Sequence, residues 1–214
     1  GIEIDNLPNI DFVVVSHKHD DHLDLPTLKA LAKRSADTKF FVPLGNAKLL
    51  NSQGVANVTE MDWGDTATYQ DLTIHCLPTQ HWSKRSISDT RKTLWSSWAV
   101  TGPEKRFYFA GDTGYFPGFK EIGEKLGPFD VAAMPIGAYE PNAMMKASHM
   151  DPAESVMASL DIKAERVLAI HFGTFDLSDE PLAEPPLLFR EAAAKTALAE
   201  DKAWVFDVGE TREF

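Results

Sequence analysis

Short apolar runs alternate with amphipathic stretches along the chain, and this pattern predicts an α/β protein. The β-branched run at 12–15 is typical of a buried strand. Pro26 opens a stretch in which apolar residues recur at helical spacing through about residue 36, and proline is well tolerated in a first helical turn. The following elements are predicted as a strand at 39–42, a helix at 46–51, and a strand followed by a hairpin within 58–77.

The second half of the chain continues this alternation. Its predicted strands are 94–100, 106–110, 131–135, 166–170 and 204–206, and its predicted helices are 119–126, a helix starting at Pro152, and 187–200. No internal repeat or low-complexity tract interrupts the pattern, and the proline- and acid-rich stretch 177–186 is too short to be a domain linker. We therefore expect a single domain over residues 1–214.

The composition is that of an ordinary soluble globular protein, with 43% hydrophobic and 25% charged residues. No apolar run approaches the roughly 18–20 residues that span a bilayer, so no transmembrane segment is expected. The N-terminus shows no basic segment followed by an apolar one, so no signal peptide is predicted. The single Cys76 cannot form an internal disulfide, which suits a reducing compartment, and we expect a cytoplasmic protein.

The formal net charge is -11, and no lysine or arginine cluster stands out. Nucleic-acid-binding proteins usually carry a basic patch or stripe, so nucleic acid is not expected as a partner. A bound pair of cations would nevertheless make one pocket locally positive. A small anionic substrate is therefore compatible with the acidic composition.

The strongest chemical signal is a histidine-aspartate motif at residues 17–22, directly after the first predicted strand. Imidazole and carboxylate are the side chains that hold a catalytic zinc-like ion. Residues at i and i+2 of an extended backbone project the same way, so His17 and His19 can converge on one ion. Asp21 and His22, on the following turn, are expected to face a second ion. A polar loop with chance histidines is the weaker interpretation.

Further metal-ligand side chains follow other predicted strands. His81 lies just past the hairpin, His171 follows 166–170, and Asp112 follows 106–110 between two glycines. In open α/β sheets, ligands gather at the carboxyl ends of strands. Each residue alone is a weak signal, but their common position favours one shared site.

Two polar residues within the hairpin are interpreted differently. His75 lies inside the apolar run at 72–77, and is expected to be a structural strand residue. Cys76 is expected to pack in the core, because no second cysteine or activating partner is visible.

The order of the motif 17–22, then His81, Asp112 and His171, resembles the metallo-β-lactamase superfamily. Within it, several stretches resemble the N-acyl-phosphatidylethanolamine-hydrolysing phospholipase D family and its bacterial relatives. These stretches are His81-Trp82-Ser83, Leu94-Trp95-Ser96-Ser97-Trp98, the run 109–115, the run 135–141, His149-Met150-Asp151-Pro152 and the run 171–175.

The resemblance implies a four-layer αβ/βα sandwich with metals in a cleft at one edge. It implies that His17, His19 and His81 hold one ion, that Asp21, His22 and His171 hold the other, and that Asp112 bridges both. His149 is implied to stand beside the metals and to contact the substrate. Zinc is the default metal, and iron, manganese, cobalt and nickel suit the same ligands.

One departure from the family is the short N-terminal part, since only sixteen residues precede His17 where relatives carry several strands. An N-terminally shortened sandwich would expose apolar surface and unpaired strand edges. We therefore predict a homodimer.

The chemistry expected is metal-assisted hydrolysis, in which a hydroxide bridging two metals attacks a small-molecule or lipid-like phosphodiester. Catalytic roles are assigned to Asp112, Asp21 and His149. Hydrolysis of an ester, lactone or amide by the same fold is an alternative, as is a non-catalytic binding protein. An oxygen-reducing di-iron role is disfavoured by His19, where such relatives carry a carboxylate.

Aromatic residues near the motifs are candidates for an apolar substrate pocket. They are Trp82, Trp95, Trp98, Tyr115, Tyr139, Phe172 and Phe175. Core packing explains the two strand tryptophans at least as well. Tyr139 and Trp82 are the favoured wall residues, because they adjoin the predicted site loops.

Overall fold

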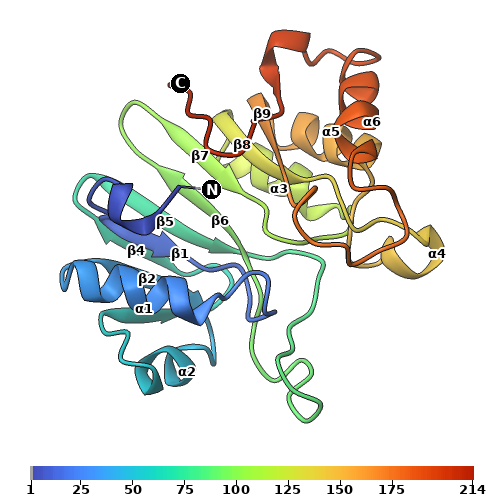
Figure 1. Cartoon of the computed structure of the whole chain (residues 1–214). Helices are drawn as coiled ribbons and strands as arrows, with labels where there is room; N and C mark the ends of the chain where they lie inside the picture. The colour runs from blue at the N-terminus through green and yellow to red at the C-terminus, as the bar shows by residue number, and fades with distance from the viewer. Residues whose placement is uncertain (1) are drawn as a thin grey trace.

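Two β-sheets lie face to face in the computed structural model of the chain, which describes residues 2–214 (Figure 1). The smaller sheet consists of three parallel strands in the order β1 (Phe12–Val14), β2 (Lys39–Pro43) and β3 (Val58–Met61). Helices α1 (Leu25–Arg34) and α2 (Ala47–Ser52) are its crossovers. Parallel neighbours need such connections, which explains the helical spacing between these strands.

The larger sheet has the strand order β10-β9-β8-β7-β6-β5-β4. Strands β4 (Thr66–Tyr69), β5 (Leu72–Leu77), β6 (Ser97–Thr101) and β7 (Arg106–Phe109) pair antiparallel. Strands β8 (Phe129–Pro135), β9 (Ala164–Ile170) and β10 (Ala203–Trp204) continue in parallel. The helices of this half are α3 (Gly118–Lys125), α4 (Asn142–Met145), α5 (Pro152–Asp161) and α6 (Glu184–Ala193), and two 3₁₀ turns lie at Ile4–Asn6 and Glu200–Lys202.

Three separate hydrophobic clusters show that the elements form four layers. One cluster joins α1 and α2 to the small sheet through Leu28, Leu50 and Phe40. A second lies between the two sheets and includes Phe41, Cys76 and Trp98. The third packs the outer helices against the large sheet, with Phe119, Val156 and Phe189 among its members. The αβ/βα sandwich implied by the family resemblance is confirmed.

Several predicted boundaries need correction. The stretch 58–77 divides between the sheets, because the chain crosses from β3 to β4 at a turn containing Gly64, whose φ is +95°. The strand predicted at 94–100 starts at Ser97, because the amides of Leu94 and Ser96 donate to Leu44 and Ser16 instead of to β5.

The end of the chain also differs from the prediction. The last long helix starts at Glu184 rather than 187, with prolines in its first turn, and stops at Ala193 rather than 200. A turn in which Thr196 Oγ1 donates to the Ala193 carbonyl ends it. The final strand is Ala203–Trp204 rather than 204–206.

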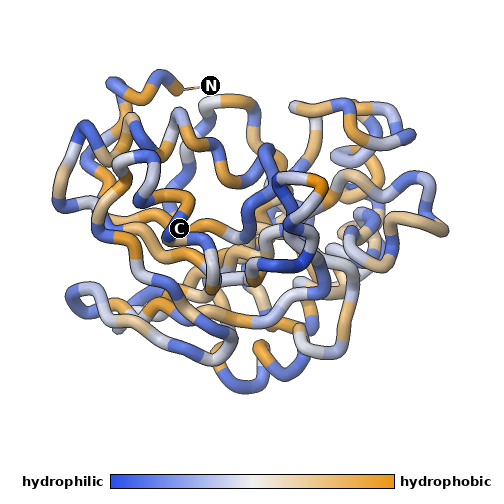
Figure 2. Tube along the Cα trace, turned by 90° about the horizontal axis from the view of Figure 1, so that it is seen from below, coloured by the Kyte–Doolittle hydropathy of each residue, from blue (hydrophilic) through white to orange (hydrophobic). Residues whose placement is uncertain are grey.

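Hydrophobic and hydrophilic residues alternate in short stretches along the whole trace (Figure 2). Among residues 2–214, no helix combines the length and apolar character needed to cross a membrane. The apolar residues are instead divided among the three clusters between the layers.

Candidate metal centre

The histidine-aspartate motif lies in the loop between β1 and α1, at the edge where the two sheets meet. Its backbone turns back on itself, since the His19 carbonyl accepts the amides of His22 at 3.1 Å and Leu23 at 2.9 Å. Asp24 then caps α1 by accepting the amide of Thr27 at 2.9 Å. This turn directs the second half of the motif toward Asp112, which the first half also approaches.

His17, His19 and His81 form a first ligand group, in which one nitrogen of each ring lies within 4.8 Å of the others. His17 Nε2 is 2.7 Å from His19 Nδ1, and His81 Nε2 is 3.4 Å from the same atom. His17 and His81 are buried, which removes competing water from their ring nitrogens. The sequence had placed His81 just past a strand end, and it lies four residues beyond β5.

Asp21, His22, Asp112 and His171 form a second ligand group. Asp21 Oδ2 lies 3.3 Å from His22 Nε2 and 3.7 Å from His171 Nε2. His171 follows β9 directly and has a φ of +59°, a left-handed conformation that non-glycine residues rarely adopt. Strained backbone of this kind is concentrated at functional sites.

Asp112 lies between the two groups. Its Oδ2 is 3.0 Å from His22 Nε2, 3.7 Å from His81 Nε2 and 3.9 Å from His17 Nε2, and its Oδ1 is 3.2 Å from His171 Nε2. The preceding residue must be small, because a Cβ on Gly111 would lie 2.6 Å from the Ser16 Cβ. Gly111, at a φ of +61°, thus allows the end of β7 to approach the motif loop.

His149 lies against the same centre. It forms a third group with His81 and Asp112, so it is placed to bind a metal ion as well. Its ring is centred 5.1 Å from that of His81 and 5.7 Å from that of His171. Two residues later Asp151 caps α5 in a reciprocal capping box with Glu154, which fixes the loop that carries His149.

Supporting contacts orient the ligands, and the sequence had given no sign of them. Ser16 Oγ lies 3.0 Å from His17 Nδ1 and 3.3 Å from His22 Nδ1, and His81 Nδ1 donates to the Ser148 carbonyl at 2.9 Å. These contacts leave the Nε2 atoms facing the centre, as outer-shell partners do in metal sites. Lys18, the basic residue inside the motif, is buried and donates to Asp89 at 2.6 Å.

Burial and charge divide the histidines into two kinds. Desolvation lowers the pKa of His81 to about 3 and that of His17 well below its usual value, so both rings are neutral and their lone pairs are free to bind a cation. Burial acts on His22 and His171 too, but Asp112 outweighs it and raises their pKa values to about 9 and about 10. The centre therefore attracts positive charge.

The donor atoms fit a metal ion. Within residues 2–214, seven buried side-chain nitrogen or oxygen atoms have no hydrogen-bond partner, and five of them lie here. These five are His19 Nε2, His22 Nε2, Asp112 Oδ1, His149 Nδ1 and His171 Nδ1. Unpaired buried polar groups are costly, and a cluster of them around two carboxylates is the pattern that cations relieve.

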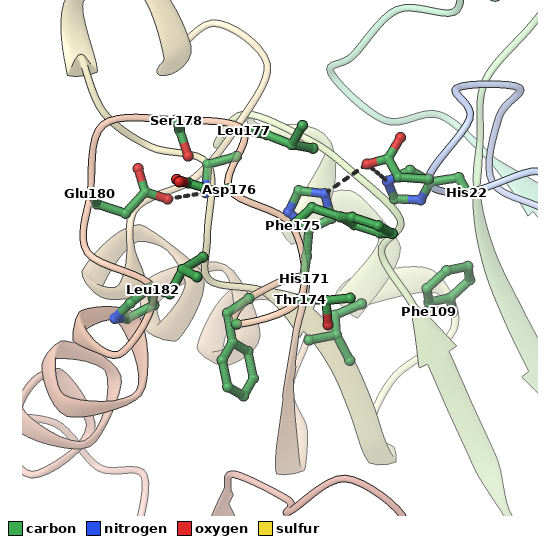
Figure 3. A pocket seen from close by; sticks show the side chains of 16 residues that line it. His22, Phe109, His171, Thr174, Phe175, Asp176, Leu177, Ser178, Glu180 and Leu182 are labelled. Carbon is green, nitrogen blue, oxygen red and sulfur yellow. Dashed lines mark hydrogen bonds and ion pairs between the residues drawn. The ribbon is translucent and has the colours of Figure 1, made fainter. Parts of the chain in front are cut away.

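A hollow of about 330 Å³ opens beside the second ligand group, lined by Asp21, His22 and His171 at one end. Figure 3 shows His22 and His171 with ion pairs to the carboxylate between them, and Glu180 at the far end. Most of the remaining wall is apolar: Phe109, Ile170, Phe172, Phe175, Leu177, Leu182 and Pro185. This apolar hollow has the size of a small-molecule site.

The predicted aromatic wall is correct in part. Phe172 and Phe175 line the apolar hollow, whereas Phe109, Leu177 and Leu182 had not been foreseen. Tyr139 is buried outside it, borders a different hollow and donates to Glu184 at 2.7 Å. Trp98 lies in the core between the sheets, and Trp95 Nε1 donates to the Thr79 carbonyl.

Trp82 lies beside the first ligand group, and the two hairpin residues follow their predictions. The ring of Trp82 meets that of His19 edge-on at 4.5 Å and borders a different hollow. His75 lies on β5, 2.9 Å from Thr101 Oγ1 and outside the three ligand groups. Cys76 is buried, and burial raises its pKa to about 12, so the thiol stays protonated.

Comparison with known proteins agrees with this geometry. Residues 2–172 match the family described as the beta-lactamase superfamily domain. The chain is 42% identical, over 99% of its length, to N-acyl-phosphatidylethanolamine-hydrolyzing phospholipase D 1 of Caenorhabditis elegans, of which it covers 63%. It is 31% identical over 95% of its length to the UPF0173 metal-dependent hydrolase MK1542 of Methanopyrus kandleri, of which it covers 82%.

A solved structure gives the same result. The metallo hydrolase Igni18 of Ignicoccus hospitalis superimposes with a TM-score of 0.75 at 26% identity, over 99% of this chain and 82% of that one. The chain spans about half to two-thirds of several curated relatives, with 63% for the nematode protein and 50% for Mycobacterium tuberculosis Rv0906. The family match, the relatives and the fold together establish that the chain belongs to the beta-lactamase superfamily and has the metallo-β-lactamase fold.

Proposed function

We propose that the protein is a binuclear metal-dependent hydrolase that cleaves phosphodiesters with an apolar substituent. The observation that carries the proposal is the pair of ligand groups joined by Asp112 and opening into the apolar hollow. His17, His19 and His81 would hold one ion, and Asp21, His22 and His171 the other. Zinc suits this set of imidazole and carboxylate donors.

The two cations would lower the pKa of water toward neutrality, polarise the phosphoryl oxygen and stabilise the charge that develops on it. The chain's own contribution is to fix the geometry. Asp112 lies against ligands of both groups, so one buried carboxylate positions both halves of the centre. Burial works against the ionised form of Asp21, but the nearby rings of His22 and His171 outweigh it and hold its pKa well below the usual range.

His149 is assigned the role of substrate contact. Its Nδ1 has no hydrogen-bond partner within residues 2–214, and burial lowers the pKa of its ring. A neutral imidazole beside the reacting group can donate a hydrogen bond to a phosphoryl oxygen or assist the leaving group. The apolar hollow would hold an acyl chain, because its wall offers Phe175, Leu177 and Leu182.

Two names among the relatives support a phosphodiester over a carboxylic ester. Those of the nematode and of Saccharomyces cerevisiae are N-acyl-phosphatidylethanolamine-hydrolyzing phospholipases D, the latter 35% identical over 99% of this chain and 46% of its own length. The second candidate is hydrolysis of an ester, lactone or amide, which the same ligand set would support.

The test combines metal analysis with turnover. About two metals per chain are expected, together with chelator-sensitive hydrolysis of a chromogenic phosphodiester and of N-acyl-phosphatidylethanolamine. Two metals with turnover of lactones or esters alone would select the second candidate. Protein that stays inert on both panels after metal reloading would contradict a hydrolase.

A further inference from the structure

A second hollow opens next to the metal ligands, and it shares no lining residue with the apolar hollow. Its volume is about 360 Å³, and its wall consists of His81, Trp82, Thr90, Arg91, Ala147 and Ser148. We call it the polar hollow. It touches His81, a member of the first ligand group, whereas the apolar hollow touches Asp21, His22 and His171 of the second group.

The two hollows therefore reach the centre at different ligand groups. Asp112 lies between these groups, and its Oδ2 is 3.7 Å from His81 Nε2 while its Oδ1 is 3.2 Å from His171 Nε2. Asp112 is itself buried and lines neither hollow, so a substrate bound at the centre would meet the two hollows beside the two ligand groups. What decides its direction is the difference between the two walls.

The walls carry charges of opposite sign. Apart from the metal ligands, the charged residues of the apolar hollow are Asp176 and Glu180, both acidic. The polar hollow contains Arg91 and no carboxylate. An anionic substituent is thus repelled from one wall and attracted to the other.

The positive charge of Arg91 is available to bind a ligand. Two other basic residues of this region are engaged, since Lys18 pairs with Asp89 at 2.6 Å and Arg85 with Asp20 at 3.0 Å, and neither lines the polar hollow. Throughout the described range 2–214, no carboxylate oxygen forms an ion pair with Arg91. A guanidinium binds carboxylate or phosphate oxygens through paired hydrogen bonds.

The backbone at Arg91 is held in an unusual conformation next to the metal motif. Its φ is +56°, and its amide donates to the Ser83 carbonyl at 2.7 Å. Ser83 Oγ in turn lies 3.0 Å from Thr93 Oγ1 and accepts the amide of Lys18 at 3.4 Å. These contacts tie the turn that carries Arg91 to the loop that carries His17 and His19.

We propose that the polar hollow binds an anionic oxygen group of the substrate through Arg91, on the far side of the scissile bond from the apolar substituent. This inference rests on the proposed function and narrows it. The substrate class is a phosphodiester with an acyl chain on one side and a second anionic group, carboxylate or phosphomonoester, on the other. Arg91 is a specificity residue and takes no part in bond cleavage.

The test uses the metal-loaded protein and three phosphodiesters with the same acyl chain. Their other ends carry a neutral hydroxyl, a carboxylate or a phosphomonoester, so the two anion sources are compared directly. Arg91→Gln is expected to raise KM about tenfold for both anionic substrates, because a hydrogen bond to a charged group is lost. Its kcat, and both constants for the neutral substrate, should stay unchanged, and Arg91→Lys should restore part of the loss.

Lys92→Gln is the matched control, since it removes the same charge from an exposed neighbour outside the hollow. An equal rise in KM for the neutral substrate, or the same rise in Lys92→Gln, would overturn the assignment. Leu177→Ala should weaken the dependence on acyl-chain length and leave discrimination between anionic and neutral ends intact. Loss of that discrimination in Leu177→Ala would contradict the separation of the two hollows.

Binding of non-hydrolysable phosphonates with the same three end groups keeps this test independent of turnover. Calorimetry should show that Arg91→Gln weakens the two anionic phosphonates about tenfold and the neutral one not at all. If the wild type hydrolyses none of the phosphodiesters, the proposed function fails while the phosphonate result still decides the role of Arg91. If turnover is found but the phosphonates bind the variant and the wild type equally, the inference fails alone.

Discussion

Asp112 links the two ligand groups of the candidate centre, because its Oδ2 lies near His17 and His81 of the first group and its Oδ1 lies near His171 of the second. Full burial leaves it no water to share its charge with, and its neighbours are histidines of both groups. His149 differs from it, since it belongs to neither of the two main ligand groups, although its ring lies beside those of His81 and His171. The two residues should therefore respond differently to substitution.

Asp112→Asn is expected to lower metal content and to reduce kcat/KM by a hundredfold or more, since even outer-shell partners of ligands are worth about 10–100-fold. His149→Ala should lower kcat by about a hundredfold, the size of an acid-base contribution, and retain both metals. Elemental analysis of each variant, with Asp71→Asn in the β4–β5 turn as control, provides the comparison. Equal metal loss in both variants would make His149 a ligand, as its grouping with His81 and Asp112 allows.

His75 provides a pH-dependent effect away from the metal ligands. Burial lowers the pKa of its ring below the usual 6.5, so the unfolded chain binds a proton more readily than the folded one. Its contribution to stability is therefore complete above pH 6.5 and is lost as the pH falls below that value. Urea unfolding between pH 7.5 and 5 should show a smaller drop in free energy for His75→Gln than for the wild type. If the free energy of unfolding fell equally with pH in His75→Gln and in the wild type, His75 would have no such effect on stability.

At the level of secondary structure, sequence patterns predicted the strands better than the loops. The β-branched run before His17 and the strand end before Asp112 were readable, because apolar periodicity reports burial. The loop 172–183 was not readable, since its position depends on contacts far apart in sequence. For this reason the sequence did not reveal that Glu180 holds the loop in place. Nor did it reveal that the amides of Leu94 and Ser96 bond to residues of distant loops and not to a neighbouring strand.

Glu180 holds the loop that forms the wall of the apolar hollow. It is buried, and its two carboxylate oxygens accept the amides of Ala138 and Glu140. Burial works against the ionised form, but these hydrogen bonds have the larger effect and lower the pKa of Glu180. Ala138 has a φ of +63°, so the carboxylate also stabilises a strained turn.

Glu180→Gln is expected to destabilise the protein by about 1–3 kcal/mol, because an amide group can accept at one oxygen only and leaves a buried amide unpaired. Urea unfolding measures the loss, and limited proteolysis should show faster cleavage within 172–183. Asp179→Asn, a change at an exposed neighbour, should match the wild type in both measurements. Unchanged stability in Glu180→Gln would mean that the loop is held by its apolar residues.

For the whole molecule, the two sheets are unequal, with three strands facing seven. β1 is an outer strand of the small sheet, and Phe107 and Leu168 on the large sheet are partly exposed. The homodimer predicted from the sequence would cover such surface. Light scattering at micromolar concentration should give twice the monomer mass.

Leu168→Lys should shift this mass toward the monomer, because it places a charge on the partly exposed face of β9. Leu187→Lys on α6 replaces the same residue type at a more exposed position and should leave the mass unchanged. A monomeric wild type would make the prediction wrong. If both variants dissociated, the interface could be assigned neither to the face of β9 nor to that of α6.

The centre joins loops that belong to both sheets, so metal binding should stabilise the molecule as a unit. His17, His19, Asp21 and His22 follow β1 of the small sheet, whereas Asp112 and His171 follow strands of the large one. A ligand that binds the folded state alone adds about 4 kcal/mol at a thousand times its dissociation constant. For a chain of this size, that corresponds to a Tm about 10 °C higher.

Chelation should therefore lower the Tm by about this amount, and reloading with zinc should restore it. Asp112→Asn is the discriminating control, because a chain that has lost the carboxylate shared by both groups should gain little from zinc and lose little to chelator. If the variant gained as much Tm from zinc as the wild type, zinc would be stabilising the chain elsewhere. If neither chelator nor zinc changed the wild-type Tm, no cation would be stabilising the fold. The converging histidines and carboxylates would then hold the two sheets together by their own ion pairs.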